Sequence, residues 1–242
     1  MKKLVIIFVV LTFAVNSIYA QEENAKFHFG LKASPSISWM KPDIKGISSD
    51  GSNINFSYGL ITEFNITSSY LFSTGIEIMN TGGNLSFDAN NVYYISDNDT
   101  IHLDSRKYNL RYLNIPIGLK FKTKEVGYFT YFAQCGIDIG LRLKATADDK
   151  VKLQNNTNTL TSADIDIIDD TQFFRTALNI GIGFEYGLVG NTVLLVGINY
   201  NNGFSNALQK NSKQLKDINN NNEPIEQKAY TNYVSLTLGV LF

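Results

Sequence analysis

Apolar residues alternate with small or polar residues along much of this chain. In 230–242, Val234, Leu236 and Leu238 share one face of an extended strand, while Ser235 and Thr237 lie on the other. A repeat of two residues is typical of a β-strand with one apolar face, and no helical period fits it. Eight stretches follow this pattern and predict strands at approximately 27–39, 53–66, 70–80, 107–122, 128–145, 172–187, 192–204 and 229–242.

The connections between these strands alternate in length. The short connections are 67–69, 123–127 and 188–191, and the long polar ones are 40–52, 81–106, 146–171 and 205–228. This alternation predicts an all-β fold, an eight-stranded antiparallel up-and-down transmembrane β-barrel with short periplasmic turns and long extracellular loops. The long connections are rich in Asn, Asp and Thr, so we expect mobile, solvated loops.

A soluble barrel would show the same alternation with its apolar face turned inward, so the volume of the side chains has to decide the orientation. The interior of an eight-stranded barrel is barely wide enough for ordinary side chains. The apolar face carries too many aromatic residues to fit there: Phe27, Phe29, Trp39, Phe56, Tyr58, Phe64, Tyr70, Phe72, Phe121, Phe129, Tyr131, Phe174, Phe184, Tyr186, Tyr200, Tyr230 and Phe242. We therefore expect this face, which includes the single cysteine, Cys135, to meet lipid and the glycine-rich face to line the lumen.

The expected lumen face also carries four positive and four negative residues. They are Lys32, Glu63, Glu77, Lys120, Asp138, Arg142, Arg175 and Glu185. Buried charges are costly unless they are paired, so this balanced set predicts a salt-bridged, closed interior. A narrow polar pore lined by the same residues is the alternative.

The N-terminus has the three parts of a secretory signal peptide. Lys2 and Lys3 precede an apolar run from Leu4 to Val15, and Ala20 offers a small residue for cleavage. The run is shorter than the roughly 20 residues of a membrane-spanning helix, which is the alternative interpretation. We expect residues 1–20 to be the signal peptide and 21–242 to be one barrel domain in the outer membrane of a Gram-negative bacterium.

Charge and composition exclude some functions. The formal charge is −1, and loss of the two N-terminal lysines would make it −3, so the chain has no basic surface for nucleic acid. The acidic segment 162–170 offers carboxylate oxygens as calcium ligands, but it lacks the glycine and the residue spacing of a calcium-binding loop. We expect no cofactor and no metal.

The two histidines are the candidates for catalysis. His28 is expected at the periplasmic rim, and His102 lies in a long loop near Asp97, Asp99 and Asp104, where an Asp/His pair would activate water. Asp is common in solvated loops for structural reasons, however, so we expect no enzyme.

One segment resembles a known family. RYLNIPIGLKF, at 111–121, resembles the outer-membrane β-barrel proteins of the PorT family, and its most specific residues are Tyr112, Leu113, Asn114, Ile115 and Pro116. The resemblance extends to the opening FHFGLKA and to the glycine-rich segment 179–187. It implies an outer-membrane barrel, and its named member is associated with type IX secretion and gliding. We expect Pro116 to face the lumen and to lose one ladder hydrogen bond at a bulge.

The C-terminus looks like the signal that the barrel-assembly machinery reads, which implies that machinery as a partner in biogenesis. The residues of this signal are Leu236, Leu238, Val240 and Phe242. Together these observations predict a monomeric barrel of structural or interaction type, surrounded by outer-membrane lipid and linked to secretion, gliding or adhesion through a secretion or surface protein. A small solute pore is one alternative, and an outer-membrane hydrolase or acyltransferase is the other.

Overall fold

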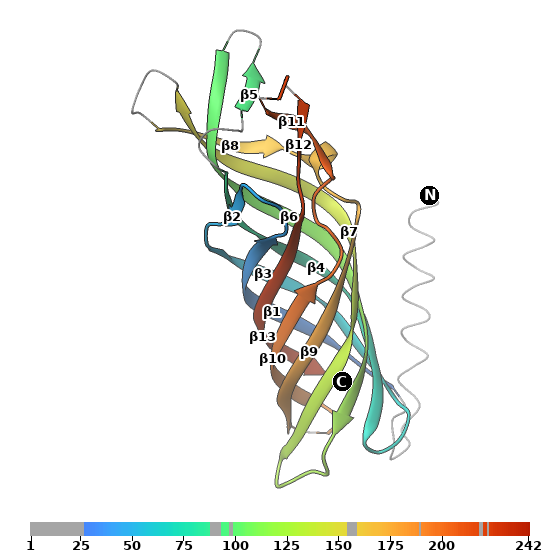
Figure 1. The fold of residues 1–242 in the computed structure, drawn as a ribbon. Helices are drawn as coiled ribbons and strands as arrows, with labels where there is room; N and C mark the ends of the chain where they lie inside the picture. The colour runs from blue at the N-terminus through green and yellow to red at the C-terminus, as the bar shows by residue number, and fades with distance from the viewer. Residues whose placement is uncertain are drawn as a thin grey trace, which may run out of the picture.

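The structure is a computed structural model that describes residues 27–87, 93–96, 99–153, 159–188, 190–217, 220–221 and 223–242. The expected signal peptide, 1–20, lies outside these residues. Eight long strands form a closed barrel (Figure 1): β1 (Phe27–Pro42), β3 (Ser52–Asn65), β4 (Tyr70–Phe87), β6 (Asp99–Lys122), β7 (Phe129–Leu153), β9 (Phe174–Gly187), β10 (Val193–Gly203) and β13 (Ala229–Leu241).

The ring closes because β1 pairs with β3 on one side and with β13 on the other. Every pairing is antiparallel and follows the order of the eight strands along the chain. The structure therefore confirms the eight-stranded up-and-down barrel. No described helix is long and apolar enough to cross a membrane.

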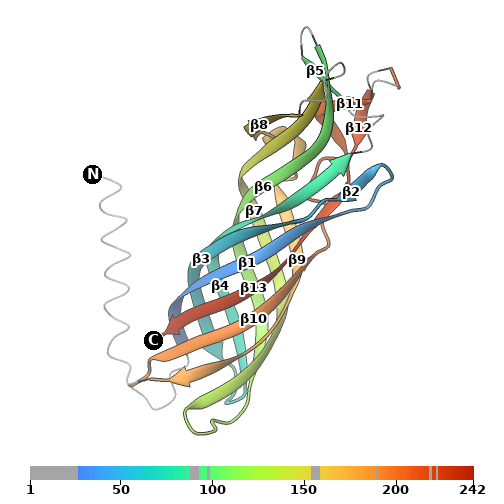
Figure 2. The same ribbon diagram turned by 90° about the vertical axis from the view of Figure 1, so that its left-hand side faces the viewer.

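Tight hydrogen-bonded turns close one end of the barrel. The amide of Tyr70 donates to Thr67 Oγ1 at 3.1 Å before β4, and Leu188 donates to the carbonyl of Thr192 at 2.9 Å before β10. Gly127 and Gly190 adopt φ of +69°, a conformation that favours glycine. The C-terminus lies at this same end (Figure 2), as the alternation of loop lengths predicts.

The outer wall is apolar, which confirms the predicted orientation of the strands. Ile54, Ile182 and Leu236 are exposed on it, as is the free thiol of Cys135. A belt of exposed apolar side chains is what a lipid-facing wall requires.

Phe132 is one of the aromatic residues of the barrel strands that point inward, as Tyr112 and Tyr233 also do. Phe132 is buried in the lumen, and glycines on β9 and β10 make room for it. A Cβ atom added at Gly183 would lie 2.5 Å from Phe132 Cζ, and one added at Gly197 would lie 3.1 Å from the same atom. These two glycines therefore allow a bulky ring inside a narrow barrel.

The described parts of the long loops contain regular structure and bury apolar side chains, so the prediction of wholly solvated loops is wrong there, whereas their mobility stays a prediction. They hold β2 (Ile47–Ser49), β5 (Tyr93–Ser96), β8 (Thr159–Asp166), β11 (Asn211–Asp217), β12 (Glu223–Glu226) and a short 3-10 helix, η2 (Ile168–Asp170). β2 pairs with β4, β8 with β7, and β11 with both β12 and β5. Figure 1 shows these elements gathered beyond the end of the barrel opposite the short turns.

A bulge marks the passage from the barrel into this extension. Arg111 pairs with Lys144, whereas the next residue of β6, Tyr112, pairs with Arg142, so Leu143 is the extra residue of β7. Beyond the bulge, the odd-numbered residues of β7 from Ala145 onward face inward.

Candidate functional site

A cluster of four charges closes the lumen at the end of the short turns. Lys120 Nζ lies 2.5 Å from Glu63 Oε1 and 2.5 Å from Glu185 Oε1. Lys122 Nζ contacts the second oxygens of the same carboxylates, at 3.2 and 2.7 Å. Lys120 Nζ also lies 4.2 Å from the centroid of the Phe132 ring. Sequence reasoning missed Lys122, although its position two residues after Lys120 places it on the same face of β6.

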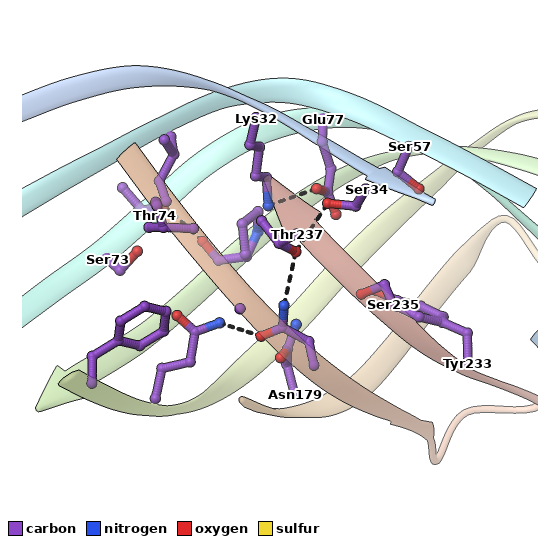
Figure 3. Close-up of a pocket in the computed structure, with 17 residues that line it drawn as sticks. Lys32, Ser34, Ser57, Ser73, Thr74, Glu77, Asn179, Tyr233, Ser235 and Thr237 are labelled. Carbon is purple, nitrogen blue, oxygen red and sulfur yellow. Dashed lines mark hydrogen bonds and ion pairs between the residues drawn. The ribbon is translucent and has the colours of Figure 1, made fainter. Parts of the chain in front are cut away.

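The second pair of lumen charges borders a small polar cavity (Figure 3). Lys32 Nζ lies 2.6 Å from Glu77 Oε2, and Asn114 donates to Glu77 Oε1 at 2.7 Å. The cavity measures about 60 Å³. Because one water molecule needs about 10–15 Å³ measured in this way, the cavity has room for a few waters and no more.

Uncharged side chains tie the strands together across the same cavity. The Ser34 and Thr237 hydroxyls lie 3.0 Å apart, and Asn199 donates to Thr237 Oγ1 at 2.8 Å. Gln134 in turn donates to Asn199 Oδ1 at 2.6 Å. These short bonds join residues of β1, β7, β10 and β13 through the lumen, so the cavity has hydrogen-bonded walls.

Asp138 and Arg175 are linked through an amide. Asn201 Nδ2 donates to Asp138 Oδ2 at 2.7 Å, and Asn201 Oδ1 accepts a hydrogen bond from Arg175 Nη2. The Tyr233 hydroxyl donates to Asp138 at 3.3 Å, and Arg175 Nε donates to Thr231 Oγ1 at 2.6 Å. Both charges are buried, and neutral groups satisfy most of their hydrogen bonds.

Arg142 is the one predicted lumen charge that does not join the others. Its Nη1 donates to the carbonyl of Ile168 at 2.7 Å, to Thr171 Oγ1 at 2.7 Å and to the carbonyl of Thr171. Arg142 lies beside the bulge at Leu143, where β7 leaves the barrel. It therefore binds the backbone of η2 and its flanking loop, and the prediction that it belongs to the lumen charge set is wrong in this respect.

The extracellular extension has an apolar core of its own, which we call the cap core. Its buried members come from strand ends and from all four long loops, and the partly buried Ile47 packs against them. The buried members are Met40, Met79, Leu85, Phe87, Leu103, Tyr108, Leu110, Tyr112, Ala145, Ala147, Val151, Ile167, Ala207, Leu208, Leu215, Ile225, Ala229 and Tyr233. The cap core therefore fills the extracellular end of the barrel with packed side chains.

Buried polar groups fix the loops of the cap. Arg106 binds Asp149 through two hydrogen bonds of 2.7 and 2.9 Å, and both side chains are fully buried. Asp170 accepts hydrogen bonds from Ser212 Oγ at 2.6 Å and from the amide of Lys213 at 2.5 Å. Asp170 thus ties η2 to β11, which belongs to the next loop along the chain.

A buried tyrosine adds a further link within the cap. Burial raises the pKa of the Tyr108 hydroxyl, so this group stays protonated at neutral pH. It lies 3.3 Å from Gln227 Oε1, to which it donates a hydrogen bond. This contact joins β6 to the segment that precedes β13.

The two histidines that the sequence offers as catalytic candidates lie on different strands, β1 and β6. His102 is half-buried in β6, where its backbone pairs with Lys152 of β7, and Asp97 lies outside the described residues. His28 is half-buried opposite Glu63 at the end of the short turns. No group of three or more His, Cys, Asp and Glu side chains in the described chain is placed to hold a metal ion.

The acidic segment 162–170 uses its carboxylates for contacts within the protein. Besides the buried Asp170, Asp166 Oδ1 accepts a hydrogen bond from the amide of Ile168 at 2.8 Å, and Asp169 forms an exposed ion pair with Lys213 at 3.5 Å. These partners occupy oxygens that a calcium ion would need.

The motif at 112–116 lines the lumen between the cap core and the small cavity. Tyr112 and Asn114 are buried and Pro116 borders the small cavity, while Leu113 and Ile115 alternate with them toward the outer wall. The predicted bulge at Pro116 is wrong. Pairing of β6 with β7 continues through Pro116. Pairing of β6 with β4 is interrupted between Ile117 and Asn114, because proline has no amide hydrogen to donate. The register is the same on both sides of this gap, so no residue is inserted.

The residues of the proposed assembly signal lie on the outer wall. Leu236, Leu238 and Phe242 are exposed there, and Val240 is half-buried. Their side chains are thus accessible from the lipid side of β13.

The comparisons with known proteins agree with this architecture. The sequence profile of the outer membrane protein beta-barrel domain matches residues 19–209. The chain belongs to this outer-membrane β-barrel family. Its location is accordingly the outer membrane of a Gram-negative bacterium. Comparison with curated proteins finds no match to this sequence.

Solved outer-membrane proteins are similar in structure at low sequence identity. Neisserial surface protein A is 13% identical, with 91% of this chain and 98% of that chain covered and a TM-score of 0.47. The outer membrane protein OprG from Pseudomonas aeruginosa is 9% identical, with coverages of 89% and 95% and a TM-score of 0.43. The attachment invasion locus protein Ail of Yersinia pestis, solved with a heparin analogue, is 13% identical, with coverages of 90% and 100% and a TM-score of 0.37.

Proposed function

We propose that this protein is a non-conducting outer-membrane barrel whose working surface is the extracellular cap. In this proposal it is a structural or interaction partner in a secretion, gliding or adhesion assembly, as its PorT-like segment 111–121 suggests, and it is not an enzyme. The observation that carries the proposal is the cap core, because a folded extracellular end offers a fixed surface to a protein partner.

The arrangement of the lumen supports a closed barrel. The Lys120 cluster lies at the periplasmic end, and Phe132 with Ile61, Leu195 and Leu241 forms a small apolar cluster near it. The cavity of about 60 Å³ borders that cluster, and the cap core fills the opposite end. An ion would have to cross two packed apolar layers.

A small solute pore is the alternative, since Lys32, Glu77 and their neighbours form a polar centre in the lumen. Single-channel recording in planar bilayers separates the two functions, and we expect no stable conductance at physiological salt. A channel whose conductance responds to Glu77→Gln but not to substitution of the exposed Lys124 would contradict the proposal.

The cap can be tested as a partner surface by site-specific photo-crosslinking in intact cells. The exposed positions Lys45, Lys210 and Glu226 report on the cap, and Glu125 in a periplasmic turn is the matched control. We expect one discrete envelope protein to be crosslinked from the cap positions alone. Adducts from Glu125 alone, or none from any cap position, would contradict the proposal.

The enzyme alternative has its own test. If the barrel were a hydrolase or acyltransferase, activity of the purified protein on peptides or lipids would depend on His102. We expect no turnover, and His102→Gln should behave as the parent protein does in every assay. Turnover that His102→Gln abolishes would contradict the proposal.

A further inference from the structure

Two adjoining hollows mark the outer wall of the barrel. One has a volume of about 430 Å³ and an almost wholly apolar lining that includes Ile37, Ile198 and Leu236. The other, of about 500 Å³, is lined by polar and charged residues of β4, β6 and β7 together with Phe56. Pro35 and Ile54 belong to both linings, so the hollows form one continuous amphipathic groove.

Strand register orders the residues along this groove. Pro35 pairs with Phe56, Asn80 pairs with Arg111, and Arg111 pairs with Lys144. Asn80 Nδ2 also donates to the carbonyl of Phe56 at 2.7 Å, which completes a row across β1, β3, β4, β6 and β7.

From β1 to β7 this row runs toward the extracellular end of the barrel, because the strands are tilted relative to the barrel axis. Pro35 lies midway along β1, whereas Lys144 lies next to the bulge where β7 leaves the barrel for the cap. On β6, the outward-facing Leu113, Ile117 and Leu119 all lie nearer the periplasm than Arg111. Arg111 is therefore the first charge above the apolar wall on this strand.

The charges at the upper end of the groove are available to an anion. Arg111 is exposed, and its contact within the described chain is neutral, with Nε donating to Asn80 Oδ1 at 3.0 Å. Lys144 Nζ lies 3.3 Å from Asp164 Oδ1, but these side chains are 53% and 73% exposed, so solvent weakens the pair. Asp148, the other nearby carboxylate, accepts hydrogen bonds from Asn109 and from the amide of Asp164.

We propose that this groove binds an anionic lipid of the outer leaflet that carries phosphomonoester groups, with an acyl chain over Ile37, Ile198 and Leu236 and a phosphate at Arg111 and Lys144. Guanidinium groups bind phosphate through paired hydrogen bonds, and basic residues at a membrane boundary attract anionic headgroups. The apolar half of the groove lies in the wall that faces lipid, which selects a membrane lipid over a soluble phosphate.

The test uses the purified full chain in vesicles of phosphatidylcholine that contain a small fraction of bis-phosphorylated lipid A or of its dephosphorylated form. Lipid retained by the protein is counted by native mass spectrometry after extraction. We expect retention of the phosphorylated form to exceed that of the dephosphorylated form by ~10-fold, and Arg111→Gln with Lys144→Gln to abolish this preference.

Lys150→Gln is the matched control for Lys144→Gln, because it removes one lysine charge from an exposed position of β7 outside the groove. It should retain the preference. Resistance of the folded band to detergent at room temperature shows that each variant is a closed barrel. Ile54→Asn, at a side chain that is 88% exposed, tests the apolar half and should lower retention of both lipid forms.

Any one of three lipid-binding results would overturn the proposal. They are equal retention of the two lipid forms by the parent protein, equal loss of the preference in Lys150→Gln, and displacement of the bound lipid by millimolar inorganic phosphate. Dimers bridged through the groove in place of bound lipid would overturn it as well, since the occupant would then be a second copy of this chain.

Discussion

Replacement of Lys120 by methionine should be one of the most damaging single changes in the barrel. The substitution keeps the length of the side chain but leaves Glu63 and Glu185 to share the single ammonium of Lys122, at 3.2 and 2.7 Å. Glu63 is fully buried, so water cannot replace the lost partner. Removing one partner of a buried ion pair costs about 3–5 kcal/mol, and we expect a loss of that size in the free energy of unfolding.

Equilibrium unfolding by urea in lipid vesicles measures this loss. A second substitution, Glu63→Gln, should recover most of it, because one lysine and one glutamate then remain in balance. Lys124→Met in the adjacent turn is the control and should be neutral, since Lys124 is exposed. The reasoning is refuted if Lys120→Met changes the stability by less than about 0.5 kcal/mol, or if Glu63→Gln makes it worse.

Three further predictions follow from the wall, the cap and the topology. Leu236→Arg should cost roughly 2–4 kcal/mol of barrel stability in the same urea assay, and a neutral result would mean that this face does not meet lipid. Leu208→Ala should lower the free energy of unfolding of the cap by about 2–5 kcal/mol, because Leu208 is fully buried. This loss should appear as faster proteolysis of the cap, and unchanged proteolysis would show that the cap core does not hold the loops. Protease added to whole cells should cut within 205–228 and leave the turns 67–69 and 188–191 intact, and cleavage in those turns would invert the topology.

The barrel itself was predictable from the sequence because its signal is local and periodic. Each strand repeats every two residues, and the volume of the aromatic side chains decides which face meets lipid. The observed bounds differ mainly where β4, β6 and β7 continue beyond the membrane wall. Most of the lumen charges were predictable for the same reason, since successive residues of a strand point to opposite faces and the apolar residues identify the lipid face.

The cap was not predictable in this way. Its apolar residues, such as Leu208, Leu215 and Ile225, are scattered among polar residues without a strand or helix period, so the loops read as solvated. Arg142 keeps the lumen-facing register of β7 up to its pair with Tyr112, but it binds the backbone of η2 and its flanking loop, and the position of that loop leaves no mark in the hydrophobic pattern. The alternation along β7 predicts that Phe132 faces the lumen. Its ring fits there only because Gly183 and Gly197 lie beside it on other strands, which the pattern of one strand does not show.

The continuity of β6 and β7 has a mechanical consequence. Both strands run from the periplasmic turn through the membrane wall and into the cap, and they stay paired with each other from Lys122–Phe132 to Ile101–Leu153. A pull on the cap along the strands therefore loads many ladder hydrogen bonds together in shear, instead of opening them one after another. A partner bound to the cap would therefore be attached to the whole barrel, and a force on the cap would be transmitted along β6 and β7 to the periplasmic turn.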